Sequence, residues 1–281
     1  MRDLLSPLGR EILAQRIKTL DARPILEIPG AGIDRDIGRF VQTLAASTPQ
    51  CEVSRVRRNT IEASIADELI SECELLRRLG TRAPEVALGP LELRDQRWIS
   101  TARPRRLQET PSSPEEAFLD IASPSNTQQP STKPFDIGLF SSTAVFGSFG
   151  MWWTYLYLNH GSSLFGFPWR IWELQVRTRV AAFEVSSAAN WVELLENYGV
   201  EHDDLIFPDW SSIAADFDGV HMSAYGVAAT QGICFSERGR VTAPPFWDVE
   251  STLWLRWVFD KPRLAADQVG LERAFHEHGD R

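Results

Sequence analysis

Three short segments in the C-terminal two thirds of this sequence hold the side chains best suited to chemistry. In the first, residues 138–143, an apolar stretch ends in Ser141, Ser142 and Thr143. Hydroxyl groups at the end of a buried strand often contact a ligand near the following loop. Serine and threonine also bind their own backbone at turns, which is the alternative interpretation. Ser141 and Ser142 are therefore candidate binding residues.

The second segment, residues 218–225, alternates between polar and apolar side chains. This period of two predicts a strand that presents His221, Ser223 and Tyr225 on one face. Imidazole exchanges protons near neutral pH, so His221 is a candidate catalytic residue. The alternative is that the polar face of a half-buried strand points to solvent.

The third segment, residues 244–255, carries two carboxylates at the entrance to an aromatic strand. Asp248 and Glu250 are two residues apart, so both face the same side if the strand begins there. Apolar surroundings can raise the pKa of a carboxylate, and such groups are common at catalytic sites. Asp248 and Glu250 are therefore candidate catalytic residues, with an exposed strand entrance as the alternative.

The strong sequence motifs of enzymes are missing. The sequence contains no Gly-x-Ser-x-Gly elbow, no phosphate-binding loop, no His-Glu-x-x-His and no Cys-x-x-Cys. His276 and His278 are close in sequence, but a charged tail is a poor place to preorganise a metal ion. We therefore expect no metal site.

The candidate residues are positioned by a chain whose composition divides it into four regions. They are 1–102 (helical N-terminal region), 103–132 (Pro/Ser-rich linker), 133–265 (Trp-rich α+β domain) and 266–281 (charged C-terminal tail). In the first region, apolar side chains recur at helical spacing, most clearly between Ile61 and Leu79. All ten tryptophans lie between Trp98 and Trp257, so residues 85–102 can also belong to the third region.

Short strands with helices between them predict an α+β fold with a mixed or antiparallel sheet, preceded by the helical N-terminal region. Ser187 and Asp209 are expected to cap two of the helices, and Gly199 is expected to end the first. A third helix is expected at residues 148–159 and a short one at Ser113. The expected strands are 137–143, 170–176, 180–185, 219–225, 230–235 and 251–259. Their apolar positions predict one sheet and a core that contains Trp172, Leu174, Phe183, Trp191, Val220, Trp254 and Leu255.

Charge and cysteine content exclude several classes of protein. The formal net charge of −9 argues against nucleic-acid binding over the whole surface, because phosphate binding needs a positive face. The arginines from Arg94 to Arg106 form either a local basic patch or a solvated loop. No apolar run approaches the roughly 20 residues that cross a bilayer, and no signal segment is recognisable near Met1. The three cysteines are scattered, so we expect a cytoplasmic protein without membrane contact.

The order of the candidate segments resembles that of mono-ADP-ribosyltransferases of the arginine–serine–glutamate type. That family has an arginine on an early strand, then an aromatic-Ser-Thr-Ser strand, then a Glu/Gln-x-Glu pair entering a late strand. Here Arg94 or Arg97 comes first, Phe140-Ser141-Ser142-Thr143 second and Asp248-Val249-Glu250 third. The chain departs from the family in having Ser-Ser-Thr in the middle motif and Asp248 in place of Glu or Gln. The resemblance covers roughly residues 90–260.

The resemblance implies an enzyme that uses NAD as substrate, by ADP-ribosyl transfer or glycohydrolysis, with a toxin or defence effector as the expected role. Glu250 would hold the ribose and stabilise positive charge, with Asp248 as the second carboxylate. Arg94 or Arg97 would bind the diphosphate, and Ser141 or Ser142 would orient the glutamate or the ribose. Phe140, Trp152 and Trp247 are the candidate walls for nicotinamide. The acceptor would be a protein or a nucleic acid, and no metal is implied.

Two other classes of function remain open. A binding module, such as an immunity or scaffold protein, fits the acidic charge and the missing motifs. A hydrolase or nuclease would use His221 with Asp218 or Glu250. NAD cleavage by the purified protein would favour the transferase or glycohydrolase, and dependence on a divalent metal would favour the hydrolase or nuclease.

Overall fold

A computed structural model gives the fold and describes residues 7–22, 34–47, 60–102, 113–121, 130–145, 149–158, 166–177 and 179–266. Its helices are α1 (Pro7–Ala22), α2 (Arg35–Ser47), α4 (Ala63–Ser71), α5 (Glu74–Arg82), α6 (Pro84–Ala87), α7 (Pro114–Ala117), α8 (Met151–Leu158), α9 (Ala188–Tyr198), α10 (Trp210–Asp216) and α11 (Ala224–Thr230). Its strands are β1 (Thr60–Ile61), β2 (Gln96–Ala102), β3 (Leu139–Thr143), β4 (Gly166–Leu174), β5 (Ala182–Val185), β6 (Gly199–His202), β7 (Leu205–Pro208), β8 (Gly219–Met222), β9 (Cys234–Glu237), β10 (Arg240–Val241), β11 (Ser251–Trp254) and β12 (Arg263–Ala266). The expected α+β fold with mixed sheets and N-terminal helices is confirmed.

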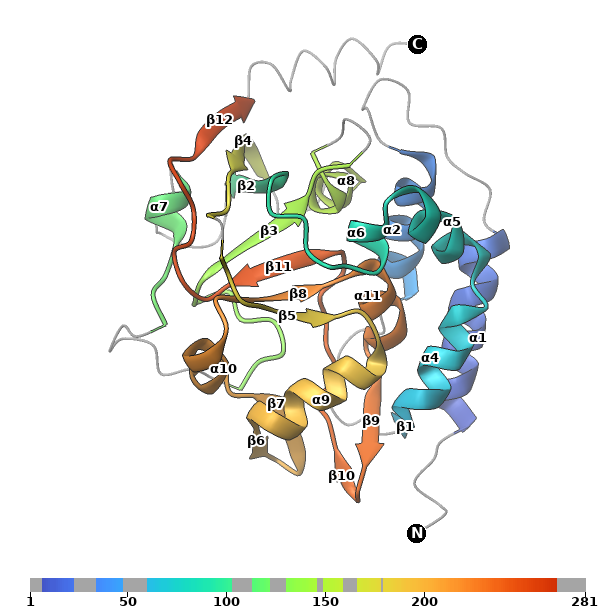
Figure 1. The fold of residues 1–281 in the computed structure, drawn as a ribbon. Coiled ribbons are helices and arrows are strands. Elements are labelled where there is room, and N and C mark those ends of the chain that lie inside the picture. The colour runs from blue at the N-terminus through green and yellow to red at the C-terminus, as the bar shows by residue number, and fades with distance from the viewer. Residues whose placement is uncertain are drawn as a thin grey trace.

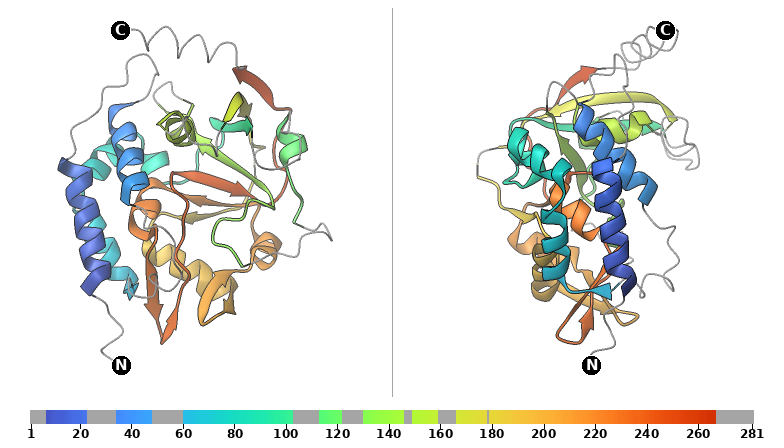
Figure 2. Two further views of the ribbon diagram at one scale, coloured as in Figure 1. Left: turned by 180° about the vertical axis from the view of Figure 1, so that it is seen from behind. Right: turned by 90° about the vertical axis from the view of Figure 1, so that its right-hand side faces the viewer.

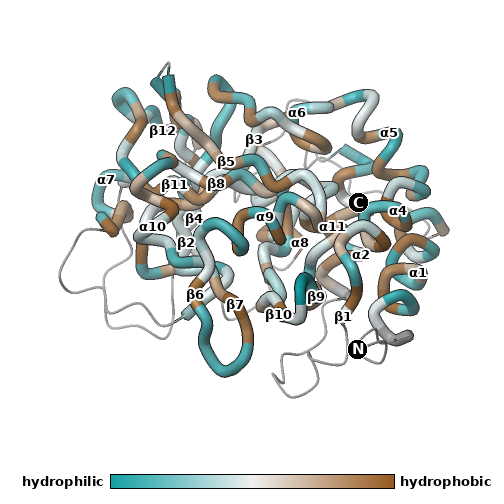
Figure 3. The backbone as a smooth tube through the Cα atoms, turned by 60° about the horizontal axis from the view of Figure 1, so that its bottom comes forward, coloured by the Kyte–Doolittle hydropathy of each residue, from teal (hydrophilic) through white to brown (hydrophobic). Residues whose placement is uncertain are grey.

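Seven strands form the central sheet, in the order β12-β4-β2-β3-β11-β8-β5 (Figure 1). All neighbours are antiparallel except β5 and β8, which are parallel. A parallel pair needs a long crossover, and the chain between β5 and β8 supplies it with α9, the β6–β7 hairpin and α10. The hydrophilic turn of that hairpin projects from the rest of the backbone (Figure 3).

Helices α1, α2, α4 and α5 lie together on one side of the sheet (Figure 2, right). Their apolar faces share a hydrophobic core with the sheet: Leu13 and Leu76 belong to the same buried cluster as Val220 and Leu253. Strand β2 also lies within the sheet, so residues 96–102 join the Trp-rich part of the chain. The N-terminal helices and the sheet are therefore packed as one body around this core.

The helix caps follow the expectations from sequence. Ser187 Oγ accepts a hydrogen bond from the backbone N of Asn190 and begins α9, which ends at Gly199. Asp209 accepts from the backbone N of Ser211 and begins α10. Ser113 caps α7 within the Pro/Ser-rich segment. Of the expected linker 103–132, the structure describes residues 113–121 and 130–132; of the expected tail, all but Ala266, including His276 and His278, lies outside the described residues.

Several expected strands differ from the structure in extent or place. The strand expected at 251–259 ends at Trp254, and the strand expected at 170–176 is β4, Gly166–Leu174. The strand expected at 219–225 ends at Met222, because the hydroxyl of Ser223 accepts a hydrogen bond from Gly226 N and begins α11. Tyr225 therefore lies on a helix and does not share a strand face with His221. The strand expected at 230–235 is β9, shifted to Cys234–Glu237, and it pairs with β1 and β10 in a separate small sheet.

The expected core is confirmed in most positions. Leu174, Trp191, Val220, Trp254 and Leu255 are buried, whereas Trp172 and Phe183 are only partly buried. Trp172 packs against the same cluster as Trp254, and this cluster is separate from the large core that contains Trp191. Among the described helices, none has both the length and the apolar character needed to cross a membrane.

Candidate active site

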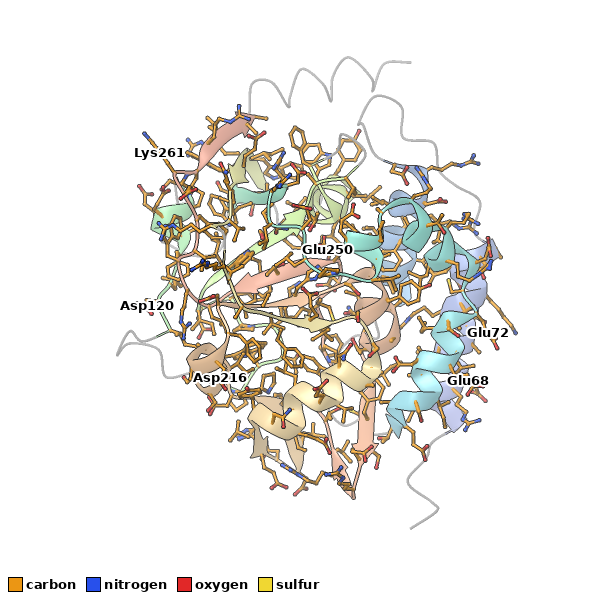
Figure 4. The ribbon with its side chains drawn as sticks, viewed as in Figure 1. Glu68, Glu72, Asp120, Asp216, Glu250 and Lys261 are labelled. Atoms are coloured by element: carbon orange, nitrogen blue, oxygen red, sulfur yellow. The ribbon has the colours of Figure 1, made fainter. Side chains whose placement is uncertain are left out.

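Glu250 lies at the centre of the molecule, whereas Glu68, Glu72, Asp120 and Asp216 lie nearer its periphery (Figure 4). It immediately precedes β11 and is fully buried.

The carboxylate of Glu250 accepts four hydrogen-bond contacts from the end of the neighbouring strand β3. Ser142 Oγ donates to Oε2 at 2.7 Å, and Thr143 Oγ1 donates to Oε1 at 2.8 Å. The backbone N of Thr143 also lies 3.1 and 3.2 Å from the two oxygens. These donors hold the carboxylate in one orientation, as a preorganised charge requires.

His221 lies between two carboxylates. On β8, it is directly opposite Thr252 of β11 on one side and Glu184 of β5 on the other. Its Nδ1 lies 2.6 Å from Glu184 Oε2, and its Nε2 lies 3.2 Å from Glu250 Oε1. We call Glu184, His221 and Glu250 the carboxylate–imidazole trio.

The imidazole of this trio is held in its charged form. Burial alone would lower the pKa of His221, because it disfavours a charge. The hydrogen bonds and negative charges of Glu184 and Glu250 outweigh that effect and raise the pKa to about 9. At neutral pH His221 is therefore an imidazolium that donates from both ring nitrogens. One imidazolium and two carboxylates give the trio a formal charge of −1.

Glu184 connects the trio to the surface. Its side chain is 31% exposed, whereas those of His221 and Glu250 are fully buried. The backbone N of Leu91 donates to Glu184 Oε1 at 2.8 Å. A Cβ added at Gly89 would lie 2.9 Å from Glu184 Oε2, so the segment before β2 passes directly over this carboxylate. Glu184 is thus the point at which the trio can exchange a proton with solvent.

The two serines of β3 have different roles. Ser142 contacts Glu250 directly, and its Oγ also accepts from the backbone N of Trp152 at 3.3 Å. Ser141 Oγ instead donates to Gln96 Oε1 and accepts from Trp254 Nε1 at 2.7 Å. Gln96 in turn donates to Thr143 Oγ1 at 2.9 Å, so Ser141 acts on Glu250 only through two other residues.

Asp248 and Glu250 do not face the same side, contrary to the expectation from sequence. Strand β11 begins only at Ser251, and Asp248 has a left-handed backbone with a φ of 68°. Asp248 Oδ2 lies 3.1 Å from Lys133 Nζ, and its Oδ1 accepts from Gln231 Nε2 at 3.0 Å. Asp248 therefore belongs to a second cluster, separate from the trio.

That second cluster is aromatic and adjoins the trio. Lys133 Nζ lies over the rings of Phe135, Phe140 and Trp152, at 5.6, 5.7 and 5.2 Å from their centroids. We call these three rings the aromatic wall. The backbone N of Trp152 contacts Ser142, which contacts Glu250, so one residue separates the wall from the trio.

The two candidate arginines lie away from the trio. Arg97 is opposite Ser142 in the register of β2 and β3, but its guanidinium pairs with Glu173 at 3.4 Å and with Asp95 at 3.9 Å. Arg94 is exposed at the turn before β2. Asp218, the other acid considered for His221, instead pairs with Arg256 at 3.0 Å and accepts from the backbone N of Ala181.

The structure thus brings Glu250, His221 and Ser142 together, and it brings Asp248, Phe140 and Trp152 together beside them. Glu184, Gln96 and Lys133 were not predicted from the sequence as site residues. Glu184 gave no sequence signal, because its contact with His221 depends on the parallel pairing of β5 with β8. Lys133 did have a sequence signal, because lysine is rare in this chain: only three of its 29 Lys and Arg residues are lysines.

The trio can stabilise a positive charge or transfer a proton. Within the described ranges, no group of three or more His, Cys, Asp and Glu side chains is arranged to hold a metal ion. Comparisons with protein-family models, curated proteins and solved structures gave no match for this chain.

Proposed function

We propose that this protein is an enzyme that cleaves the nicotinamide–ribose bond of NAD, by ADP-ribosyl transfer or by glycohydrolysis. Glu250 is the carboxylate that stabilises the ribosyl cation formed as this bond breaks. The observation that carries the proposal is the hydrogen bond from Ser142 Oγ to Glu250, between the serine and glutamate segments of the resemblance. The arginine segment lies on or directly before the next strand, so the three segments lie on or directly before the adjacent strands β2, β3 and β11.

The charge of the trio supports this assignment. A bond that breaks with positive charge on the ribose is favoured by a fixed negative charge nearby, and more strongly in a site that excludes water. His221 neutralises one of the two carboxylates and leaves a formal charge of −1 beside the hydroxyl-rich end of β3. The imidazolium also fixes the orientation of Glu250, which already accepts hydrogen bonds from Ser142 and Thr143.

The aromatic wall supports the choice of an aromatic leaving group. Phe140 and Trp152 are partly exposed, and the Ser142 contact joins Trp152 to Glu250. Planar rings such as nicotinamide bind by stacking on aromatic side chains. Arg97 rather than Arg94 is the better candidate for the diphosphate, because it pairs in register with Ser142. A phosphate there would replace the carboxylate of Glu173 as its partner.

The test is NAD turnover by wild type, by Glu250→Gln and by Glu193→Gln. Glutamine keeps the shape of Glu250 and removes its charge, so turnover should fall about a hundred- to a thousandfold while NAD binding remains. Glu193 is an exposed carboxylate on α9, and its substitution should leave turnover unchanged. Thermal melts establish that each variant is folded. Equal turnover by wild type and Glu250→Gln, or no turnover by wild type with protein and nucleic-acid acceptors, would refute the proposal.

A second candidate function is favoured by the position of His221. An imidazolium between two carboxylates, one of them partly exposed, can act as a general acid in a hydrolase or nuclease. In that case hydrolysis of nitrophenyl esters or of single-stranded nucleic acid should be lost in Glu184→Gln as well as in Glu250→Gln. NAD turnover would then be absent from wild type, which distinguishes the two functions. Absence of both activities would favour a binding module.

A further inference from the structure

Lys133 differs from the other lysines of this chain. Lys18 and Lys261 are exposed, and Lys261 lies at the edge of the molecule (Figure 4). The side chain of Lys133 is only 8% exposed. Arginine is the usual cation of this sequence, and it keeps its proton at neutral pH. A buried lysine in such a chain places an ionisable amine where arginine would give only a permanent charge.

The amine has a proton acceptor at hydrogen-bond distance. Lys133 Nζ donates to Asp248 Oδ2 at 3.1 Å and to the backbone O of Trp247 at 2.7 Å. Gln231 holds both the side chain and the backbone of Asp248. Its Nε2 donates to Asp248 Oδ1, and its Oε1 accepts from the backbone N of Asp248 at 3.1 Å. These two hydrogen bonds stabilise the left-handed backbone of Asp248, a conformation that is uncommon for residues other than glycine.

The surroundings of the amine are apolar, and two of the residues around it reach solvent. The aromatic wall of Phe135, Phe140 and Trp152 surrounds Nζ, and Phe135 is 57% exposed. The Asp248 side chain is 25% exposed. A flat apolar molecule can therefore approach along Phe135 toward Lys133, with Asp248 at the rim.

We propose that Lys133 is a nucleophilic amine that forms an imine with an aromatic or apolar aldehyde or ketone. Asp248 takes a proton from the ammonium, and the free Nζ pair forms a bond to the carbonyl carbon. The carbonyl π pair moves to oxygen, which takes that proton back from Asp248 and gives a carbinolamine. The nitrogen of this carbinolamine still carries two protons and the positive charge, and Asp248 takes one of these protons and passes it to the hydroxyl. The hydroxyl leaves as water while the freed nitrogen lone pair forms the C=N bond, which leaves a protonated imine and an ionised Asp248.

Burial supports this chemistry because it lowers the pKa of Lys133, although the charge of Asp248 acts in the opposite direction. The neutral amine is the nucleophile, and each unit by which a lysine pKa falls raises its free-amine fraction about tenfold. The inference does not rest on NAD chemistry, since imine formation requires neither NAD nor Glu250.

The experiment uses benzaldehyde with sodium cyanoborohydride, which reduces the imine to a stable secondary amine, and locates the added mass by peptide mapping. At pH 7, Lys133 should be labelled faster than Lys18 and Lys261, which serve as internal references in the same chain. Formaldehyde is the second probe, because it forms an imine without stacking on the wall. Phe135→Ala should lower labelling of Lys133 by benzaldehyde several-fold and leave its labelling by formaldehyde nearly unchanged.

Lys133→Arg is the matched variant, because it keeps the charge over the aromatic rings and cannot form an imine. Loss of the fast labelling in Lys133→Arg, with Lys18 and Lys261 unchanged, supports the proposal. If that variant does not fold, the comparison of the three lysines in wild type decides the question alone. Labelling of Lys133 no faster than that of Lys18 and Lys261 between pH 6 and pH 9 would overturn the proposal.

Discussion

His221 is the single residue whose ionisation should affect stability most clearly near neutral pH. Its pKa is about 9 in the folded protein and near the ordinary value of 6.5 in the unfolded chain. The folded state therefore holds this proton more tightly. The resulting stabilisation is fully present below pH 6.5 and is lost as the pH rises to about 9. The loss is at most about 3 kcal/mol. Urea unfolding of wild type at intervals from pH 6 to pH 10 measures it.

The control for this pH dependence is an exposed histidine. His202→Gln should keep the fall in stability between pH 6.5 and pH 9, because the His202 side chain is 52% exposed. His221→Gln should remove most of this fall in the free energy of unfolding. Should His221→Gln fail to fold, NMR titration of the His221 ring in wild type gives the same answer. A midpoint near 6.5 would contradict the charged trio.

Ser141 and Ser142 offer a matched pair of substitutions at neighbouring positions. Ser142→Ala removes a hydrogen bond to the Glu250 carboxylate, and such bonds to charged groups contribute about 1.5–3 kcal/mol. NAD turnover should fall about tenfold or more. Ser141→Ala should affect turnover less, but it leaves Trp254 Nε1 without its hydroxyl acceptor and should lower the free energy of unfolding by about 1–3 kcal/mol. Equal effects on turnover would contradict these separate roles.

At the scale of helices and strands, two helical glycines should respond in opposite ways to alanine. Gly226 lies in α11, where an added Cβ would overlap the backbone O of Val185 on β5. Gly80 lies in α5, where an added Cβ would meet Leu88 Cδ1 at an ordinary 3.5 Å. Alanine favours a helix over glycine by about 0.5–1 kcal/mol.

Gly80→Ala should therefore raise the midpoint of urea unfolding. Gly226→Ala should lower it despite the better helix former, because α11 must move away from β5. A rise in the midpoint for both variants would show that α11 does not pack as closely on β5 as described.

Elements with local signals were predictable from sequence, and those that depend on distant partners were not. Ser187 and Asp209 mark helix starts through hydrogen bonds within a few residues, so their sequence context is sufficient. Ser223 has the same cap geometry, but the alternation around His221 favoured a longer strand. The apolar segment at 230–235 indicated a strand but not its sheet, because β9 pairs with the remote β1.

The contacts within the candidate site also depend on distant partners and were not predictable from sequence. Glu250 and His221 were identified by residue type and by their position in or beside apolar strands. Their contact, and the contact of His221 with Glu184, follows from the registers of β11, β8 and β5, which no local pattern specifies. The left-handed backbone of Asp248 likewise separates it from Glu250, because that turn is maintained by Gln231 from another element.

Across the whole molecule, the N-terminal helices are tied to the sheet by polar contacts as well as by the shared core. Arg16 of α1 is buried and donates to the backbone O of Ala228 and, at 2.7 Å, to that of Gln231. Burial lowers the pKa of Arg16 to about 10. Gln231 also holds Asp248, so α1 is connected to the Lys133 cluster through one residue. Asp67 of α4 accepts from the backbone N of Ala188 at the start of α9.

These connections predict that the N-terminal helices and the sheet unfold together. The chain provides a natural probe for each part: all ten tryptophans lie between Trp98 and Trp257, whereas Cys73 lies between α4 and α5. Cys73 is fully buried, and burial raises the pKa of its thiol to about 12, so it should resist alkylation in the folded protein.

In a urea series, tryptophan fluorescence and alkylation of Cys73 by iodoacetamide, quantified by peptide mapping, should therefore change at the same urea concentration. Arg16→Met removes two hydrogen bonds from a charged donor and should shift both transitions to lower urea together, with a loss of about 2–4 kcal/mol. Lys18→Met, an exposed substitution two residues along α1, is the control and should shift neither. Alkylation of Cys73 at urea concentrations that leave the fluorescence unchanged would mean that the helices detach first. The buried contacts of Arg16 would then be too weak to couple the two parts of the fold.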